Sequence, residues 1–308
     1  MSILFYSRGD DPQPWRDALT NAFPDIAFEI WPDVRDLNAV RYALVWNPPA
    51  GMLAKLPNLR AVLALGAGVD SLLADPTTPQ VPVVRLVDAG LAAQMAEYAV
   101  YGVLHFHRRM GDYRRLQQER KWKPLEPVPT NQWAVGIMGT GVIGGLIAGY
   151  LIALGYRVRG WSRSGKPVKG VEVFAGDDQF EPFLTGSNAV INVLPLTEHT
   201  CSILNTRAFS AMPRASYIIN IGRGGHLVEA ELLDALESGQ IAGAMLDVFN
   251  EEPLPASSPL WAHPNVVITP HVAGVTIAAE AEAQVVANIR RMEKGELPIG
   301  IVDRAKGY

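Results

Sequence analysis

The chain has 308 residues, 48% hydrophobic and 19% charged, which is enough for two domains with substantial cores and is unlike a disordered protein. The net charge is −4, and Asp112 and Glu119 interrupt the basic residues between 108 and 123, so nucleic-acid binding is not expected. The single cysteine, Cys201, excludes an internal disulfide framework, fits a reducing compartment and is expected to be buried.

No segment predicts export or membrane insertion. The apolar run 2–6 is too short for the core of a signal peptide, and no basic residue precedes it. The most apolar segment, 142–156, contains several glycines and is shorter than the roughly 20 residues that a membrane span requires. We therefore expect a cytoplasmic protein with no membrane partner, in which 142–156 begins a helix buried against a sheet.

In the first third of the chain, short apolar runs alternate with helical stretches. The strand-like runs are 3–6, 28–31, 43–46, 61–65 and 83–86, with a helix near 14–23 after the first of them. Continuous apolar strands are typical of a parallel sheet that is covered on both faces. The pattern therefore predicts an α/β unit.

A long helical stretch follows, from Leu91 to about Lys121, and it is typical of a connector between two domains. Its basic residues predict a solvated helix face. His105 and His107 lie two positions apart, on different faces of a helix, and no cluster of acids or cysteines accompanies them, so no metal site is expected. The proline-dense stretch 124–129 predicts a stiff connector or a projecting arm.

The alternation of strands and helices restarts near Trp133. Strand-like runs are expected at 134–138, 157–161, 189–194, 215–221, 241–248 and 266–269, with helices from 142 and from 228. A final helix at 276–294 ends before Gly295 with basic residues in its last turn, and we expect it to pack on the first domain. The predicted fold is α/β, with two doubly wound parallel-sheet domains (Rossmann-like or flavodoxin-like) and a cleft between them.

A glycine-rich turn joins the first strand of this second unit to its helix. The residues are Gly139, Thr140, Gly141, Val142, Ile143 and Gly144, which fit the pattern G-x-G-x-x-G. The first glycine permits a tight turn, the second lets backbone amides approach a pyrophosphate, and the third allows close helix packing. The strand before and the helix after it favour a dinucleotide site over a chance loop.

The next strand ends in a basic turn that contains Ser162, Arg163, Ser164 and Lys166. An acid at this point normally binds the ribose 2′-hydroxyl of NAD, and none is present. Arginine and hydroxyl groups instead suit a 2′-phosphate, through charge-assisted hydrogen bonds. The sequence therefore predicts NADPH as the preferred cofactor over NADH, with an ordinary basic surface turn as the alternative.

Three polar residues follow three separate strand-like runs: Arg223, Glu252 and His271. Ligands of open α/β sheets bind outside the carboxyl ends of strands, so we expect these residues to converge. Arginine is a fixed cation whose parallel N–H donors suit a carboxylate. Glutamate can orient and charge a histidine, which exchanges protons near neutral pH. The set favours the reduction of a 2-oxo acid.

Two other classes of protein stay open at this point. One is a nucleotide-sensing protein on the same scaffold, and the other is a Rossmann-type transferase that uses another adenosine cofactor. A sensor has no need of a carboxylate clamp, an acid and an imidazole, and a transferase does not require glycines that hold a pyrophosphate beside a basic ribose turn. Both arguments favour an enzyme that reduces its substrate.

Motifs along nearly the whole chain resemble those of the D-isomer-specific 2-hydroxyacid dehydrogenases. They are the glycine turn 139–144, Leu194-Pro195-Leu196-Thr197 with Thr200, Asn220-Ile221-Gly222-Arg223-Gly224-Gly225, Leu246-Asp247-Val248-Phe249 with Glu252-Pro253-Leu254, and Pro270-His271. Within that family, Trp46-Asn47-Pro48-Pro49, 65–70 and the basic turn 162–164 are most similar to glyoxylate/hydroxypyruvate reductases of the A type. A 2-hydroxyacid dehydrogenase for a different or larger 2-oxo acid is the alternative within the family.

The resemblance implies a substrate-binding domain of residues 1–94 and 275–308, with a dinucleotide-binding domain of residues 95–274 inserted in it. It implies that Arg223, Glu252 and His271 are catalytic: Arg223 would hold the substrate carboxylate, while His271, charged with help from Glu252, would protonate the developing alkoxide. The substrate residues that it implies are Trp46, Gly66, Ala67, Gly68, Val69, Trp122 and Arg223.

By the same resemblance, the cofactor site extends beyond the glycine turn and the basic turn. The further residues are Leu194, Pro195, Thr200, Ile221, Gly222, Asp247, His271 and Gly274. Asp247 and the carbonyl of Ile221 would hold the nicotinamide carboxamide. The resemblance also implies a homodimer, in which the long helix forms most of the interface and Trp122 reaches the neighbouring subunit's site.

Overall fold

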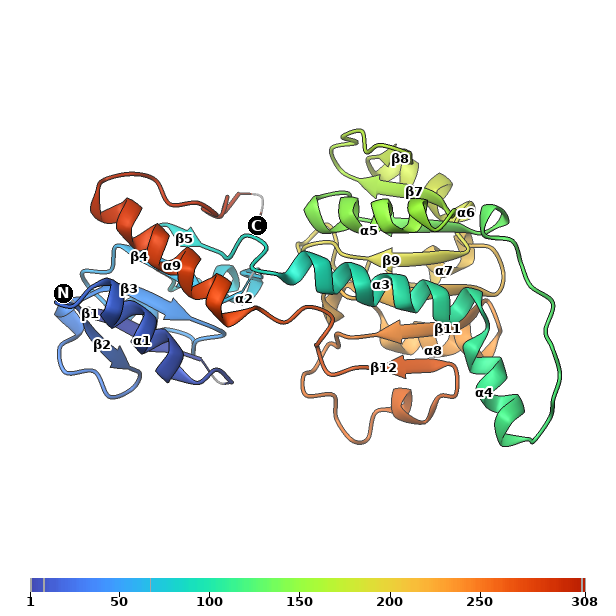
Figure 1. Ribbon diagram of the computed structural model, residues 1–308, viewed down its shortest axis with the longest axis horizontal. Helices are drawn as coiled ribbons and strands as arrows, with labels where there is room; N and C mark the ends of the chain where they lie inside the picture. Colours follow the sequence, from blue (N-terminus) through green and yellow to red (C-terminus); the bar gives the residue numbers. More distant parts are fainter. Residues whose placement is uncertain (1, 8, 67, 306, 308) are drawn as a thin grey trace. The chain divides into compact units, whose positions relative to one another are not determined.

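The computed structural model describes residues 2–7, 9–66, 68–305 and 307. The chain divides into two compact units, one of residues 1–91 with 276–308 and one of residues 92–275 (Figure 1). The sequence placed its domain boundaries after residues 94 and 274. We call these parts unit 1 and unit 2.

In the described residues, unit 1 contains a five-stranded parallel sheet with the strand order β2-β1-β3-β4-β5. The strands are β1 (Ser2–Tyr6), β2 (Ala27–Ile30), β3 (Val40–Val45), β4 (Ala61–Ala64) and β5 (Val83–Val84). This order is that of flavodoxin-like folds. All four residues of β4 are buried, as expected for a strand that is covered on both faces.

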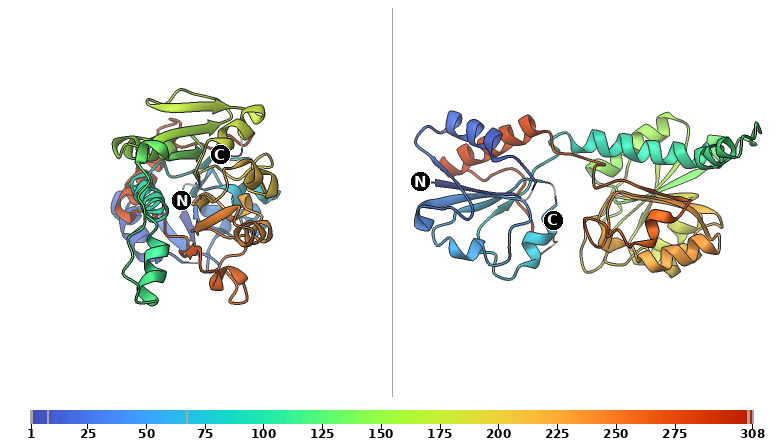
Figure 2. Two further views of the ribbon diagram at one scale, coloured as in Figure 1. Left: turned by 90° about the vertical axis from the view of Figure 1, so that its right-hand side faces the viewer. Right: turned by 90° about the horizontal axis from the view of Figure 1, so that it is seen from below.

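Helices cover both faces of the sheet of unit 1. The helical elements are α1 (Pro12–Ala22), η1 (Leu37–Ala39), η2 (Leu53–Lys55), α2 (Asp70–Ala74) and α9 (Ala278–Glu293). Helices α1 and α9 lie together on one face (Figure 2), where Trp15 and Leu19 join Val285 and Ile289 in one apolar core. The last helix therefore returns to unit 1, as the sequence predicted.

Local signals set the ends of these two helices. Helix α1 begins at Pro12, because the side chain of Asp11 accepts a hydrogen bond from the backbone nitrogen of Gln13 at 2.9 Å, and proline suits the first helical position. Helix α9 ends before Gly295, whose φ of +78° is the left-handed conformation that glycine adopts easily.

The sheet of unit 2 is also parallel, with the order β12-β11-β10-β9-β6-β7-β8 in the described residues. Its strands are β6 (Ala134–Met138), β7 (Arg157–Ser162), β8 (Val171–Ala175), β9 (Ala189–Asn192), β10 (Ser216–Asn220), β11 (Ile241–Leu246) and β12 (Val266–Ile268). The order reverses between β6 and β9. That switch point is where open α/β sheets bind their ligands.

Two apolar cores lie on the two faces of this sheet. Residues of α3 and α5 share a core with one face, and residues of α6, α7 and α8 share a core with the other. The helical elements are α3 (Leu91–His107), α4 (Met110–Gln118), η3 (Thr130–Gln132), α5 (Val142–Ala153), η4 (Asp177–Gln179), α6 (Phe180–Thr185), α7 (Thr206–Ala211), η5 (Gly224–His226), α8 (Glu229–Glu237) and η6 (Pro259–Ala262). The expected fold class, α/β with two doubly wound parallel sheets, is confirmed.

Three local expectations were wrong. The helix expected from Leu91 to Lys121 is interrupted, because α3 ends at His107 and Arg109 adopts a left-handed conformation (φ +56°) before α4 begins. Strand β8 was not anticipated, since it lies at the sheet edge, is only partly buried and includes Glu172. Cys201 is exposed, because it lies in a surface turn.

None of the helices in the described part of the chain combines the length and the apolar character that crossing a bilayer requires.

Candidate active site

The glycine turn lies between β6 and α5, beside the switch point of the sheet of unit 2. Gly139 has a φ of +101° and donates its N–H to the carbonyl of Trp161 at 2.9 Å. A Cβ on Gly144 would lie 1.8 Å from the carbonyl oxygen of Gly139, so the helix packs directly on the turn. A Cβ on Gly141 would meet no described atom within 4 Å. The first and third glycines are required by the fold, while the second leaves open space.

This arrangement suits a pyrophosphate. Gly141 stands in extended conformation immediately before α5, so the first backbone N–H groups of that helix follow it. Val142, next in the chain, has 76% of its surface exposed although it is apolar and begins a buried helix. The turn therefore presents backbone donors at an open surface.

The basic turn follows β7, the strand that pairs with β6 on the side away from the switch point. Ser162 ends the strand, and its hydroxyl oxygen is buried with no hydrogen-bond partner among the described residues. Burying a polar group without a partner is costly, so such atoms often await a ligand or water. Arg163, Ser164 and Lys166 are exposed next to it. The turn therefore exposes cationic and hydroxyl groups of the kind that bind phosphate.

The segment after β9 continues the same edge of the sheet. Leu194 is buried, and the carbonyl of Pro195 accepts a hydrogen bond from the hydroxyl of Thr200 at 2.8 Å. That hydroxyl also accepts from the backbone nitrogen of Thr197 at 2.8 Å, which ties the loop into a compact turn. The three predicted residues therefore belong to one ordered loop at the switch point.

Arg223 lies in a turn directly after β10. Ile221 and Gly222 are buried, and a guanidinium nitrogen of Arg223 donates to the carbonyl of Gly222 at 2.8 Å. A Cβ on Gly224 would lie within 2.0 Å of the carbonyl group of Phe249. Only glycine allows this approach, and it brings the Arg223 turn against the loop that carries Glu252.

Asp247 is the buried residue that shapes the loop of His271. Its carboxylate accepts hydrogen bonds from the hydroxyl of Thr269 (2.6 Å) and from the backbone nitrogens of Val272 (2.8 Å) and Ala273 (2.9 Å). Its carbonyl accepts from the backbone nitrogen of His271 at 2.9 Å. Four bonds from one residue thus fix the loop 269–273.

The backbone of His271 is held in the left-handed conformation, with a φ of +55°. Left-handed conformations are uncommon in residues other than glycine, although asparagine, aspartate and histidine adopt them more often than most, and they persist where surrounding bonds enforce them. The hydrogen bonds to Asp247 do so here. The ring of His271 is 40% exposed, so the loop presents it at the surface of unit 2.

His271 and Glu252 form a charge-assisted pair, with Nδ1 and Oε2 at 2.7 Å. The other carboxylate oxygen of Glu252 accepts from the backbone nitrogen of Phe249 at 3.0 Å. Burial alone would raise the pKa of Glu252. The hydrogen bonds from His271 and Phe249, with the positive charges of His271 and Arg223, outweigh burial and lower that pKa below its ordinary value. The carboxylate is therefore charged at neutral pH.

Unit 2 thus brings together the three residues that the sequence singled out. Glu252 contacts His271, and the charge of Arg223 is near enough to act on Glu252. Gly274 follows the His271 loop and is half-buried. Trp122, in the arm after α4, is fully exposed. The catalytic, substrate and cofactor roles of these residues stay predictions.

The remaining predicted substrate residues belong to unit 1. Trp46 follows β3, and a Cβ on Gly66 would lie 2.3 Å from its ring, so the two residues pack together. Val69 is buried before α2, and Gly68 is half-buried. Ala67 lies outside the described residues.

Four polar residues of unit 2 escaped the sequence analysis. Asn192 and His226 are fully buried near the Arg223 turn, and the hydroxyl of Tyr98 lies 2.6 Å from that of Thr269. Burial and the charge of Asp247 raise the pKa of Tyr98 to about 12, so its phenol stays protonated and can donate. Asn192 ends strand β9 and Thr269 follows strand β12, and position at the end of a strand was a signal for both. Nothing local marks Tyr98 or His226.

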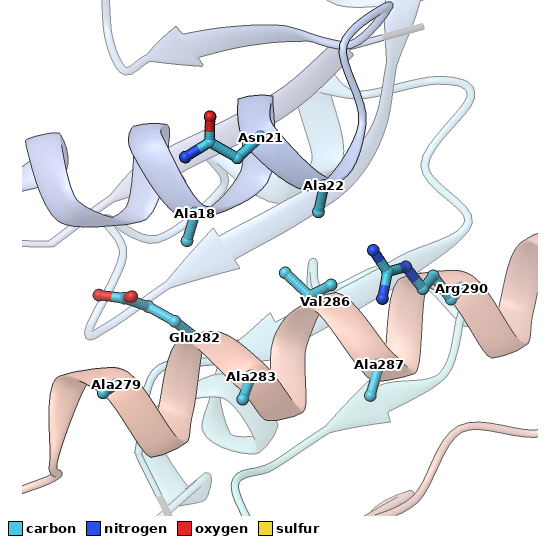
Figure 3. Close-up of a pocket in the computed structure, with 9 residues that line it drawn as sticks. All are labelled: Ala18, Asn21, Ala22, Ala279, Glu282, Ala283, Val286, Ala287 and Arg290. Atoms are coloured by element: carbon cyan, nitrogen blue, oxygen red, sulfur yellow. The ribbon is translucent and has the colours of Figure 1, made fainter.

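The groove drawn in Figure 3 lies between α1 and α9 of unit 1. Its volume is about 500 Å³, and its lining consists of Ala18, Asn21, Ala22, Ala279, Glu282, Ala283, Val286, Ala287 and Arg290. No predicted site residue contributes to this lining. Within the described residues, no group of three or more histidines, cysteines and acids is arranged to hold a metal ion.

Comparison with known proteins identifies related sequences. The family model "D-isomer specific 2-hydroxyacid dehydrogenase, NAD binding domain" matches residues 100–273. Glyoxylate/hydroxypyruvate reductase A of Yersinia enterocolitica is 46% identical over 314 aligned positions, which cover all of both chains. The protein of that name from Serratia proteamaculans is 45% identical, again over the full length of both.

Solved structures resemble the chain over its whole length. A D-isomer specific 2-hydroxyacid dehydrogenase from Xanthobacter autotrophicus, in complex with NADPH and MES, has a TM-score of 0.94 and 42% identity, covering 100% of this chain and 99% of that one. An NADPH-dependent glyoxylate/hydroxypyruvate reductase from Sinorhizobium meliloti, in complex with NADP and sulfate, has a TM-score of 0.92 and 36% identity, with the same coverage.

Proposed function

Because this chain belongs to the family of D-isomer-specific 2-hydroxyacid dehydrogenases, we propose that it is an enzyme that reduces a small 2-oxo acid to the 2-hydroxy acid with NADPH. The observation that carries this proposal is the pair of His271 and Glu252 at the carboxyl edge of the sheet, with Arg223 near enough to lower the pKa of Glu252. An acid, an imidazole and a fixed cation are the groups that this reduction requires.

His271 is the proposed proton donor. Its Nδ1 lies 2.7 Å from a carboxylate oxygen of Glu252 and donates a hydrogen bond to it, which orients the ring. The other ring nitrogen, Nε2, then transfers a proton to the oxygen of the former ketone. General acid catalysis of this kind contributes about 10² to 10⁴ in rate.

Arg223 is the proposed anchor for the substrate carboxylate. Its guanidinium supplies a planar set of N–H donors, and the tight packing of Gly224 on the Phe249 carbonyl fixes the turn that carries it. A cation beside the reacting ketone also stabilises the negative charge that develops on its oxygen.

The cofactor residues fit NADPH. The glycine turn 139–144 offers donors for the pyrophosphate, and the turn 162–166 offers hydroxyl and cationic groups for the 2′-phosphate. The segments 194–200 and 221–222, with Asp247 and Gly274, would border the nicotinamide half. NADPH, when bound, supplies the hydride. Relatives whose structures contain NADPH or NADP support this choice.

The substrate class rests on the names of the relatives, which act on glyoxylate and hydroxypyruvate. We assign substrate binding to unit 1, through Trp46 and residues 66–69, and dinucleotide binding to unit 2. A homodimer that uses the exposed Trp122 near a neighbouring site remains a prediction, which sedimentation velocity tests: a monomer would exclude it. The cytoplasmic location also remains a prediction.

One assay tests the proposed activity. Purified protein is mixed with NADPH or NADH and with glyoxylate, hydroxypyruvate, pyruvate or a larger 2-oxo acid, and nicotinamide absorbance is followed. Fast oxidation of NADPH by glyoxylate and hydroxypyruvate is expected. Preference for a larger acid would indicate a different dehydrogenase of this family. No oxidation by any acid, with tight binding of NADPH, would favour a nucleotide sensor.

A further inference from the structure

A cluster of polar side chains is fully buried where β9 and β10 end. Asn192, Asn220 and His226 each have 0% of their surface exposed. Buried polar groups are costly unless they are hydrogen-bonded, so a cluster of three has to be well connected. We call these residues the buried polar cluster, and none of them has a role in the proposed reaction.

Both ring nitrogens of His226 face hydrogen-bonding partners. Nδ1 accepts from the side-chain amide of Asn192 at 2.8 Å and from the backbone nitrogen of Arg223 at 3.1 Å. Nε2 lies 3.2 Å from the carbonyl oxygen of Pro195. The carbonyl can only accept and the two amides donate, so the ring is neutral with its hydrogen on Nε2.

The amide of Asn192 has one consistent orientation. Its oxygen accepts from the backbone nitrogen of Leu194 at 3.2 Å, so its nitrogen must face His226 and the side-chain oxygen of Asn220, the latter at 2.9 Å. This orientation agrees with the tautomer of His226. The cluster therefore has a single pattern of donors and acceptors.

The cluster holds two backbone segments. It contacts the Arg223 turn at the nitrogen and the carbonyl of Arg223, the latter by the amide of Asn220 at 3.1 Å. It contacts the loop after β9 at Leu194 and Pro195. A Cβ on Gly222 would lie 2.9 Å from the Asn192 amide nitrogen and 3.2 Å from His226 Nδ1, so the turn packs directly on the cluster.

We propose that His226 is a positioning residue for both binding functions of unit 2, holding the Arg223 turn through Nδ1 and the Leu194–Pro195 loop through Nε2. This inference rests on the proposed function, in which Arg223 anchors the substrate and Pro195 borders the cofactor. Because the two nitrogens have different partners, the two functions can be separated by substitution.

Two variants make that separation. In His226→Asn, the amide oxygen stands near the position of Nδ1, so the acceptor for Arg223 is kept and the donor to Pro195 is lost. In His226→Gln, the longer side chain places an amide nitrogen near the position of Nε2, so the donor to Pro195 is kept and the acceptor is lost. Each variant removes hydrogen bonds to only one segment.

The expected changes are opposite. Loss of one hydrogen bond changes an affinity by about two- to tenfold. His226→Asn should raise the Kd for NADPH, measured by nicotinamide fluorescence, by about that factor and leave the KM for the 2-oxo acid within about twofold. His226→Gln should raise the KM, at saturating NADPH, and leave the Kd within about twofold.

Leu232→Ala is the matched control. Leu232 is fully buried in α8 on the same side of the sheet and has no polar group, so its truncation loosens the core without changing the cluster. It should lower the melting temperature without separating Kd from KM. If both His226 variants change Kd and KM together, or change neither, the two ring nitrogens do not position the two segments separately and the proposal is wrong.

A measurement on the unmodified protein does not depend on the folding of variants. Nitrogen NMR of histidine-labelled protein distinguishes the tautomers, and we expect a neutral ring protonated at Nε2. A ring protonated at Nδ1 would overturn the proposal. Failure of the proposed function would look different: no 2-oxo acid would oxidise NADPH, while the tautomer and the change in NADPH Kd in His226→Asn would still be found.

Discussion

The two units share one design and differ in what stands at the ends of their strands. In unit 1, strands β3, β4 and β5 end in the buried apolar residues Val45, Ala64 and Val84. In unit 2, β9 and β10 end in buried asparagines, and Asp247 follows β11 with 1% of its surface exposed. Both sheets are parallel, so the fold does not require these polar residues.

The difference shows where the molecule accepts an energetic cost for its function. Each buried polar group in unit 2 needs partners, and the structure supplies them from loops that carry Arg223, His271 and Pro195. Polar strand ends in unit 2 thus become anchors for loops. In unit 1, by contrast, the chain after the strands packs closely on itself, and Gly66 lies directly against the ring of Trp46.

The largest effect should come from substituting His271, the proposed proton donor, whose loop is held by Asp247 at the polar end of β11. His271→Ala removes the proposed proton donor, so kcat should fall by about 10²- to 10⁴-fold, far more than the Kd for NADPH changes. Thr20→Ala removes a hydroxyl from α1 of unit 1 and should leave both values unchanged. Near-normal turnover in His271→Ala would show that the strand ends of unit 2 have no catalytic role.

The next largest effect should come from changing Arg223, the cation near Glu252. Arg223→Lys keeps the charge and loses the planar set of donors, so kcat/KM for the 2-oxo acid should fall by about 10- to 100-fold. NADPH binding should stay within about twofold. Arg214→Lys, an exposed position whose guanidinium contacts the carbonyl of Ser238, is the matched control. An equal loss in both variants would remove Arg223 from the substrate site.

A smaller effect should come from changing Arg163 in the basic turn, the proposed site of the 2′-phosphate. Arg163→Ala should raise the KM for NADPH by roughly tenfold and leave the KM for NADH unchanged, because only NADPH carries the 2′-phosphate. The control variant is Lys169→Ala, which removes an exposed positive charge from the same connection between β7 and β8. If both cofactors were affected equally by Arg163→Ala, Arg163 would not bind the 2′-phosphate.

The smallest effect concerns stability and its dependence on pH. The pKa of Glu252 is below its ordinary value of 4.5 in the folded chain, so its pairing stabilises the fold above about pH 4.5 and is lost as the pH falls through the lowered pKa. Glu252→Gln should therefore reduce the free energy of unfolding at pH 7, and this reduction should shrink as the pH falls below 4.5.

The size of that reduction follows from exposure. The side chains of His271 and Glu252 are 40% and 36% exposed, so solvent limits the contribution of the pair to less than about 1 kcal/mol. Urea unfolding at several pH values measures it. A difference between the two proteins that grows towards acid pH would contradict the direction of the pKa shift.

Much of the fold could be predicted because its signals are local. The glycine turn is recognised from its spacing, and strands β4 and β6 are recognised from runs that contain no polar side chain. Strand β8 was missed because an edge strand that is half exposed carries polar residues and loses this signal. The break at Arg109 was missed because neither glycine nor proline marks it.

The candidate site was predictable for the same reason where residues follow strands directly, as Arg223 does. Residues whose partners are remote gave no such signal. Tyr98 bonds to Thr269, 171 positions away, and the bonds of His226 to Asn192 and Pro195 span 34 and 31 positions. Their importance comes from which strands are neighbours, and that was not known from spacing.

The sequence by itself determined the family, the α/β class, the glycine turn and the residues that follow the strands of unit 2. Tertiary structure alone decided which of those strands lie side by side, and therefore which buried polar groups could satisfy one another. The physical reason is that a buried donor or acceptor must find its partner within hydrogen-bond distance. In a doubly wound sheet, the order of the strands brings that partner from a distant part of the chain.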